Sequence, residues 1–169
     1  MTKCVWESPA KNRKDEPFLS VMDRDGYYYV QRAGVDSVAF ILYNAGAVGL
    51  CRCAHGATRE VSNRSFTGSI DLEGNWKESI SRVVQIEVRE EAGYDVTPDQ
   101  IVLIGWYEVG TQTNEKVYLY IVDVTGLTPG LTQLDSREQE DILGVVWNPT
   151  EPTHDWKANL LIDQVRRRY

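Results

Sequence analysis

The chain has 169 residues, of which 42% are hydrophobic and 25% charged, as in an ordinary folded protein of one domain. No apolar run is long enough to span a membrane and no secretory signal opens the chain, so we expect no membrane partner. The formal net charge of −7 argues against a nucleic-acid partner, because phosphate backbones are bound by basic surfaces. Three cysteines cannot all pair within one chain, so we expect a reduced, cytoplasmic protein.

The predicted elements run from strands through a central helix to further strands and a closing helix. Residues 1–16 are polar and are expected to be flexible at the start, and 18–32 is typical of a β-hairpin. Residues 54–63 and 127–141 are predicted loops. The remaining strands are predicted at 38–43, 48–53, 66–71, 101–109, 117–124 and 142–147, and the helices at 76–92 and 156–168. This order favours an α/β fold with helices layered on a mixed sheet.

The predicted strand at 48–53 carries two of the three cysteines, and a histidine follows it. Cys51, Cys53 and His55 form a C-x-C-x-H cluster, which lacks the usual spacing and a clear fourth ligand for zinc. Cysteines that alternate along a strand are typical of packing, so we expect Cys51 and Cys53 to pack in the sheet.

The central helix carries a cluster of glutamates on one side. At about 100° per residue, Glu87, Glu90 and Glu91 fall within one arc of roughly 100°. Apolar residues such as Val83 and Val84 share that arc, whereas ordinary polar residues fill the opposite one. Ionised carboxylates that face inward are costly unless they are paired or bind a metal. The cluster therefore predicts a divalent-metal site, and an exposed acidic face is the alternative.

The helix and its spacing resemble the Nudix box, G-x5-E-x7-R-E-U-x-E-E-x-G-U, where U is apolar. The matching residues are Glu78, Glu87, Val88, Glu90, Glu91, Gly93 and Tyr94. Two positions depart from the pattern. Ile86 stands where the family has an arginine, and the leading glycine is displaced, so that Gly68 resembles its equivalent with about four residues inserted after it.

The resemblance implies a Nudix-like α/β/α sandwich over residues 35–169, preceded by a segment at 1–34 that carries the hairpin and contributes to a homodimer. It implies hydrolysis of a nucleoside diphosphate linked to another group, with Mg²⁺ or Mn²⁺ held by Glu78, Glu87, Glu90 and Glu91. Divalent metals neutralise the diphosphate and activate a water molecule. Glu87 and Glu91 would thus be catalytic.

A general base is expected in the loop before the last strand. In the ADP-ribose branch of the family this base is a loop glutamate, and Glu138 and Glu140 occupy the corresponding segment. We favour Glu138. The alternative for both residues is a solvated acidic loop.

The substrate class follows from the segment Ile104–Ile121, which resembles ADP-sugar and UDP-sugar diphosphatases, with Glu115 as the loop glutamate of their substrate cleft. Small-molecule nucleotides such as ADP-ribose or a nucleotide sugar are the expected substrates. Aromatic faces stack on bases, which makes Tyr28, Trp106 and Tyr107 candidates, although core packing is the alternative for Trp106. Guanidinium groups suit phosphate oxygens, so Arg52, Arg59 and Arg64 are candidate phosphate ligands, with exposed surface arginines as the alternative.

Two rival functions remain open. Because Ile86 replaces the motif arginine, the chain could be a Nudix-fold nucleotide-binding or sensor domain with little turnover. RNA cap removal is the third reading, and the net charge of −7 argues against the basic RNA track that it needs.

Overall fold

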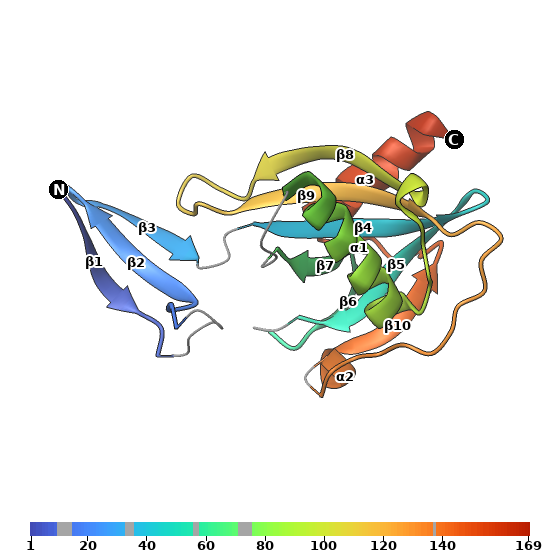
Figure 1. Ribbon diagram of the computed structural model, residues 1–169, viewed down its shortest axis with the longest axis horizontal. Helices are drawn as coiled ribbons and strands as arrows, with labels where there is room; N and C mark the ends of the chain where they lie inside the picture. Colours follow the sequence, from blue (N-terminus) through green and yellow to red (C-terminus); the bar gives the residue numbers. More distant parts are fainter. Residues whose placement is uncertain (10–14, 33–35, 56–57, 71–75, 137) are drawn as a thin grey trace.

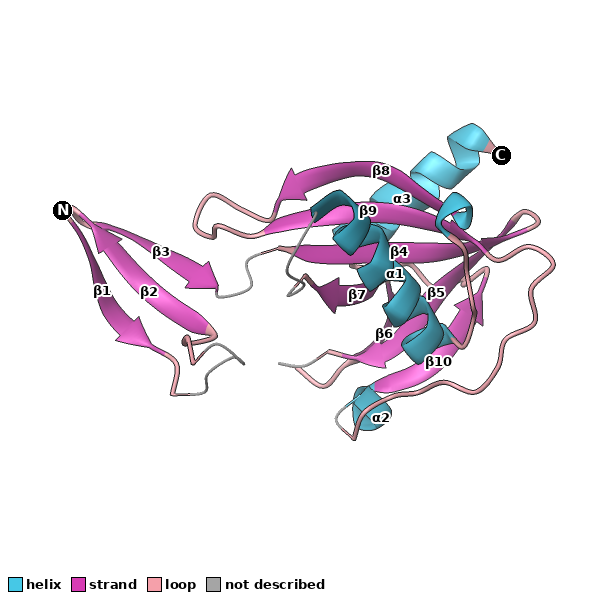
Figure 2. Cartoon of the chain, viewed as in Figure 1, coloured by secondary structure: helices cyan, strands magenta, loops and turns pink. Residues whose placement is uncertain are grey.

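The computed structural model describes residues 1–9, 15–32, 36–55, 58–70, 76–136 and 138–169, and for 76–79 it describes the backbone alone. Two β-sheets are present in this part of the chain: a three-stranded sheet at the N-terminus and a seven-stranded sheet with helices on its faces (Figure 1). In the view of Figure 2 the small sheet lies to one side of the larger layered body.

The N-terminal sheet is antiparallel with the order β1-β2-β3, where the strands span Thr2–Glu7, Leu19–Arg24 and Tyr27–Arg32. The predicted hairpin is confirmed as β2 and β3. Its turn uses positive φ angles at Asp25 and Gly26, which suit a tight hairpin. The expectation of a flexible start is wrong for Thr2–Glu7. These residues include strand-favouring Val5 and Trp6, and they pair along the free edge of β2.

The large sheet has the order β10-β5-β4-β9-β8, with β6 paired to β5 and β7 paired to β4. Its β4 and β9 are parallel and its other pairs are antiparallel, so the predicted mixed sheet is confirmed. The strands are β4 (Ser37–Asn44), β5 (Ala47–Ala54), β6 (Val61–Arg64), β7 (Phe66–Ser69), β8 (Ile101–Glu108), β9 (Lys116–Asp123) and β10 (Ile142–Trp147).

The strands β6 and β7 fill the space where β4 and β5 separate. β4 pairs with β5 over 42–44 and with β7 over 37–40. The sequence predicted a loop at 54–63, but Val61–Arg64 is a strand because β5 offers it a free edge beyond the hairpin. This arrangement brings β7 directly under the central helix, with which it is in contact.

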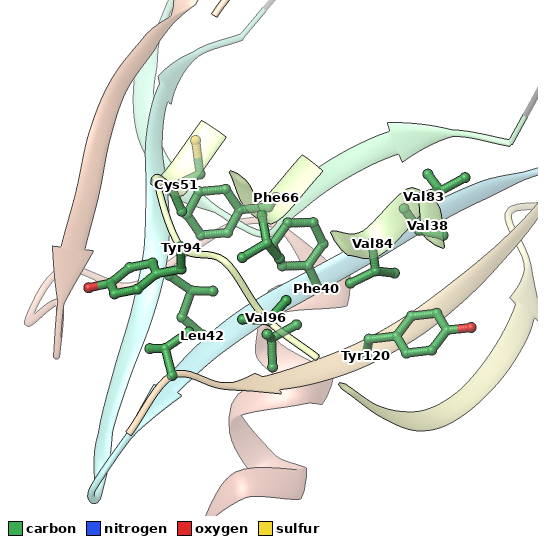
Figure 3. Packing of buried hydrophobic residues seen from close by; sticks show 14 of the residues in the cluster. Val38, Phe40, Leu42, Cys51, Phe66, Val83, Val84, Tyr94, Val96 and Tyr120 are labelled. Carbon is green, nitrogen blue, oxygen red and sulfur yellow. The ribbon is translucent and has the colours of Figure 1, made fainter. Parts of the chain in front are cut away.

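Two helices cover the two faces of the large sheet. The predicted helices are confirmed as α1 (Trp76–Ala92) and α3 (Trp156–Arg168), and short helical turns occur at η1 (Pro98–Gln100) and α2 (Glu138–Asp141). One apolar core lies on the α1 face (Figure 3) and a second lies on the α3 face, which together give the expected α/β/α layers. β4 contributes to both, since Val38–Leu42 are fully buried, as their continuous apolar run predicts.

The end of α1 is set by Gly93, which has a φ of 77°. A Cβ at this position would lie 2.5 Å from the carbonyl oxygen of Gly130. The left-handed cap and the close approach of the following loop therefore both require glycine, as the sequence predicted for the cap.

The N-terminal sheet contacts the loop between β8 and β9. The amide of Val30 donates to the carbonyl of Gln112 at 2.8 Å, and the Tyr27 hydroxyl donates to the carbonyl of Thr111 at 2.8 Å. This loop leads into Glu115, so the small sheet lies beside that residue. None of the described helices is long and apolar enough to cross a membrane.

Candidate active site

The inner side of α1 places two glutamates against the sheet. Val84 and Val88 are fully buried on this side, and Glu91, one turn beyond, is only 7% exposed. Glu87 and Glu90 are half-buried, whereas Ile86 is 38% exposed. The predicted orientation of the helix is therefore confirmed, and the alternative of an exposed acidic face does not hold for Glu91.

Glu91 is a strongly perturbed carboxylate of the site. Burial, followed by the charges of Glu87 and Glu138, raises its pKa to about 9. Its Oε2 atom is buried and has no hydrogen-bond partner among the residues that the structure describes. A buried carboxylate oxygen without a partner is costly, and a bound cation would offset that cost.

The carboxylate of Glu87 lies against the backbone of Gly68 on β7. A Cβ added at Gly68 would stand 2.5 Å from Cγ and Cδ of Glu87, a distance at which atoms overlap. Gly68 thus leaves the space that the Glu87 side chain occupies. The displaced motif glycine inferred from the sequence does lie beside the first glutamate of the Glu87–Glu91 run.

A cavity of about 540 Å³ opens beside these two residues. It lies where β4 and β9 begin, and it receives side chains from α1, α2, β7, the β8–β9 loop, β3 and the start of α3. Its lining residues include Gly68, Glu87, Glu115, Glu138, Trp156 and Lys157. Four of these were predicted from the sequence, and Trp156 and Lys157 were not.

A smaller cavity of about 260 Å³ adjoins the first one. Thr67, Glu138 and Lys157 line both, so the two form one continuous region. Glu91 and Arg64 line the smaller cavity. The region therefore brings together Glu87, Glu91 and Glu138, which come from two helices that are about 50 residues apart in the sequence.

Glu138 is held by a reciprocal contact with Asp135. The amide of Asp135 donates to Oε2 of Glu138 at 2.8 Å, and the amide of Glu138 donates to Oδ1 of Asp135 at 2.9 Å. This arrangement starts the short helix α2 and turns Glu138 into the cavities. Glu140 is exposed and is not among the described residues that line either cavity.

The larger cavity is also lined by an ion pair between the N-terminal sheet and the β8–β9 loop. Arg32 Nη1 lies 2.7 Å from Glu115 Oε2, and the Ser37 hydroxyl donates to Glu115 Oε1 at 2.8 Å. The predicted loop glutamate is thus in the cavity, where it is bonded to protein groups.

The predicted arginines have protein partners. Arg52 Nη1 lies 3.3 Å from oxygens of both Asn63 and Glu151, and Arg59 pairs with Asp141. Neither is among the described residues that line the two cavities. Arg64, which lines the smaller one, donates from Nε to the Ser62 hydroxyl at 3.3 Å.

The predicted aromatic contacts lie outside the cavities. Tyr28 is 55% exposed on the N-terminal sheet, and Trp106 is 53% exposed on β8. The core-packing alternative for Trp106 is therefore wrong. The ammonium of Lys116 lies 5.0 Å from the Trp106 ring. Tyr107 is not among the described residues that line the cavities. Its ring meets that of Trp156, which lines the larger cavity, edge to face at 6.2 Å.

The start of α3 contributes residues that the sequence analysis missed. Asp155 caps the helix by accepting from the Lys157 amide at 3.1 Å, and it also accepts from the amide and hydroxyl of Ser65 at 2.9 and 2.5 Å. Burial alone would raise the pKa of Asp155, but the Ser65 hydrogen bonds and the Lys157 ammonium lower it overall. An aspartate before the apolar repeat of 156–168 is a readable cap signal, yet nothing in the sequence shows that this cap faces the glutamates.

The donor set can be tested against a metal ion. Carboxylate oxygens suit Mg²⁺ and Mn²⁺, and the unpartnered Oε2 of Glu91 fits such a role. No three His, Cys, Asp or Glu side chains within the described residues are already gathered into a complete site. Glu78 lies in the first turn of α1, and its side chain is outside the described part.

The cysteine cluster packs as expected from the sequence. Cys51 is buried in the core on the α1 face, and Cys53 is half-buried against the same core. Both line the smaller cavity beside Glu91.

The comparison with solved structures decides the fold. A crystal structure of an ADP compounds hydrolase superposes with a TM-score of 0.67 and 15% sequence identity, and the match covers 98% of this chain and 92% of that chain. This chain shares the fold of that structure. The Nudix-like fold class is thereby confirmed, and the N-terminal sheet is included in the match. Neither protein-family models nor curated proteins match this chain.

Proposed function

We propose that this protein is a metal-dependent hydrolase that cleaves the diphosphate of ADP-ribose or a nucleotide sugar, giving a nucleoside monophosphate and a sugar phosphate. The observation that carries the proposal is the buried, unpartnered carboxylate of Glu91, which shares one region with Glu87 and Glu138. Groups with strongly perturbed pKa values in a cavity are typical of catalytic sites. The hydrolase fold, which the structural neighbour shares, supports the same reaction class.

The glutamates of α1 would hold the metal. Glu87, Glu90 and Glu91, with Glu78, supply oxygen ligands of the kind that Mg²⁺ and Mn²⁺ prefer. The bound metal would neutralise the diphosphate and lower the pKa of a water molecule. Ionised Glu91 is favoured once a cation lies beside it, so binding would reverse the rise in its pKa.

Glu138 would serve as the general base. It lines both cavities, and its contact with Asp135 fixes one oxygen while the carboxylate still faces the region of Glu87 and Glu91. In the reaction, water gives a proton to Glu138, and the oxygen of that water forms a new bond to phosphorus. The bridging P–O bond then breaks, and one phosphate leaves with each product.

We further propose that the protein acts as a homodimer through its N-terminal sheet. Val5, Trp6, Phe18 and Tyr28 are exposed apolar or aromatic side chains on this small sheet and its approach. Exposed apolar side chains on a small sheet are available for contact with a second copy of the chain. Light scattering of the whole chain tests this assignment, and a monomer at micromolar concentration would contradict it.

The function is tested with a panel of nucleotide sugars and dinucleotides, with products separated by chromatography. We expect release of AMP or UMP that requires Mg²⁺ or Mn²⁺. Binding of a nucleotide without any turnover in either metal would instead establish the sensor alternative.

A further inference from the structure

The larger cavity is lined by aromatic and apolar side chains as well as by glutamates. Trp156 is 42% exposed, although an indole of this size usually buries more of its surface. It lines the cavity together with Val109 and Val117, while Glu87 and Glu138 line it from α1 and α2. The cavity thus offers both an aromatic surface and carboxylates.

Trp156 is held by contacts on two sides. The Tyr107 ring meets it edge to face, with an interplanar angle of 76°. Its backbone follows Asp155, whose side chain is bonded to Ser65 and to the amide of Lys157. An aromatic side chain that is fixed before the ligand arrives loses little entropy on binding.

A cation lies beside Trp156 and is shared by the two cavities. The Lys157 ammonium is 5.9 Å from the centre of the Trp156 ring and 3.4 Å from Asp155 Oδ1. Lys157 lines both cavities, so it belongs both to the cavity that Trp156 and Glu87 line and to the one that Glu91 lines. An aromatic ring, a cation and carboxylates that suit a metal are the groups that would contact the base, a phosphate and the metal-bound diphosphate of a nucleotide.

We infer that Trp156 is the surface on which the nucleotide base stacks, with Lys157 directed towards the adjoining phosphate. This inference rests on the proposed function, and it replaces Tyr28 and Trp106 as the base-binding residues. Trp106 is exposed to a similar degree, but it lies outside the cavity. It therefore provides a matched control.

The test measures binding of AMP in the presence of Mg²⁺ by calorimetry, with ribose 5-phosphate as a probe that lacks the base. Stacking on an aromatic side chain is worth about tenfold or more in affinity. We expect Trp156→Ala to weaken AMP binding by at least about tenfold while ribose 5-phosphate binds as before. Trp156→Phe should restore most of the affinity, and Trp106→Ala should leave it unchanged.

Equal affinity of wild type and Trp156→Ala for AMP would overturn the inference, as would a wild type that does not bind AMP. The outcome is separable from that of the proposed function because no hydrolysis is measured. Binding that depends on Trp156 without any turnover would keep the inference and remove the hydrolase. Turnover with an unchanged KM in Trp156→Ala would do the reverse.

Discussion

The side chain of Glu87 lies so close to the backbone of Gly68 that it fits only because residue 68 has no side chain. The Glu87 carboxylate occupies the space in which a Cβ of residue 68 would stand. The strand β7 and the helix α1 therefore position a candidate metal ligand jointly, and neither element does so alone.

The contact predicts that Gly68→Ala impairs activity without unfolding the protein. The methyl group would push aside the Glu87 side chain from Cγ to the carboxylate, whereas the nearest atoms include none of the backbone. A displacement of about 1 Å can cost on the order of 100-fold in rate, so we expect a fall of that size in kcat/KM. Thermal unfolding should change little.

Gly105→Ala is the control for that change. Gly105 also lies in a strand, and a Cβ there would be 3.7 Å from its nearest neighbour, an atom of Tyr107. Its activity should equal that of the wild type. Equal activity of Gly68→Ala and Gly105→Ala would show that the Gly68 contact is unrelated to the reaction.

The raised pKa of Glu91 predicts a particular dependence of stability on pH. The folded pKa is about 9, compared with an ordinary value of 4.5, so between these values the folded state retains a proton that the unfolded state loses. The stability contributed by protonated Glu91 is fully present below pH 4.5 and is lost as pH rises towards 9. Without metal, the wild type should therefore lose stability relative to Glu91→Gln between pH 5 and 8.

Denaturant unfolding of both proteins in EDTA measures this difference. Glu140→Gln, which changes an exposed glutamate, should follow the wild type. Added Mg²⁺ should stabilise the wild type more at pH 8 than at pH 5, because the cation favours ionised Glu91. If the free energies of unfolding of wild type and Glu91→Gln changed in parallel at all pH values, the raised pKa of Glu91 would be contradicted.

The exposure of Ile86 predicts that arginine is tolerated at this position. Ile86 is 38% exposed on α1, so a longer side chain can extend into solvent. We expect Ile86→Arg to change the free energy of unfolding by no more than about 0.5 kcal/mol, with activity unchanged or increased. A loss of folding, seen by circular dichroism, would show that residue 86 has no room for a charge.

The two glutamates of α2 should differ in their effects. Glu138 lines both cavities and Glu140 is exposed, so only the first can take a proton from water beside Glu87. We expect Glu138→Gln to lower kcat by about 100-fold or more, with little change in KM, while Glu140→Gln has no effect. A larger loss of kcat in Glu140→Gln than in Glu138→Gln would show that Glu140 is the general base.

The sequence predicted the elements whose patterns are local. The period of α1, its end at Gly93 and the apolar run of β4 are all determined by neighbours in the sequence, and the structure confirms them. The strands β1 and β6 were missed because each is stabilised by a partner strand more than by its own residues. Their pairing could not be seen in a local pattern.

The candidate site shows the same division. Glu87 and Glu91 were predicted from motif spacing, and Glu138 from its place in the loop before the last strand. The structure brings the three together. Trp156 was missed because its exposure depends on the cap at Asp155, which is bonded to Ser65 some 90 residues earlier in the sequence. Contacts between residues far apart in the sequence decide which aromatic side chain faces a cavity, and a local sequence pattern does not predict such contacts.

The most direct measurement compares hydrolysis of ADP-ribose and UDP-glucose by the wild type and Glu91→Gln, each with Mg²⁺, with Mn²⁺ and with EDTA. We predict metal-dependent release of AMP or UMP by the wild type, and a loss of several orders of magnitude in Glu91→Gln with the fold retained. Turnover by Glu91→Gln equal to that of the wild type, or turnover in EDTA, would contradict a metal-dependent site built on Glu91.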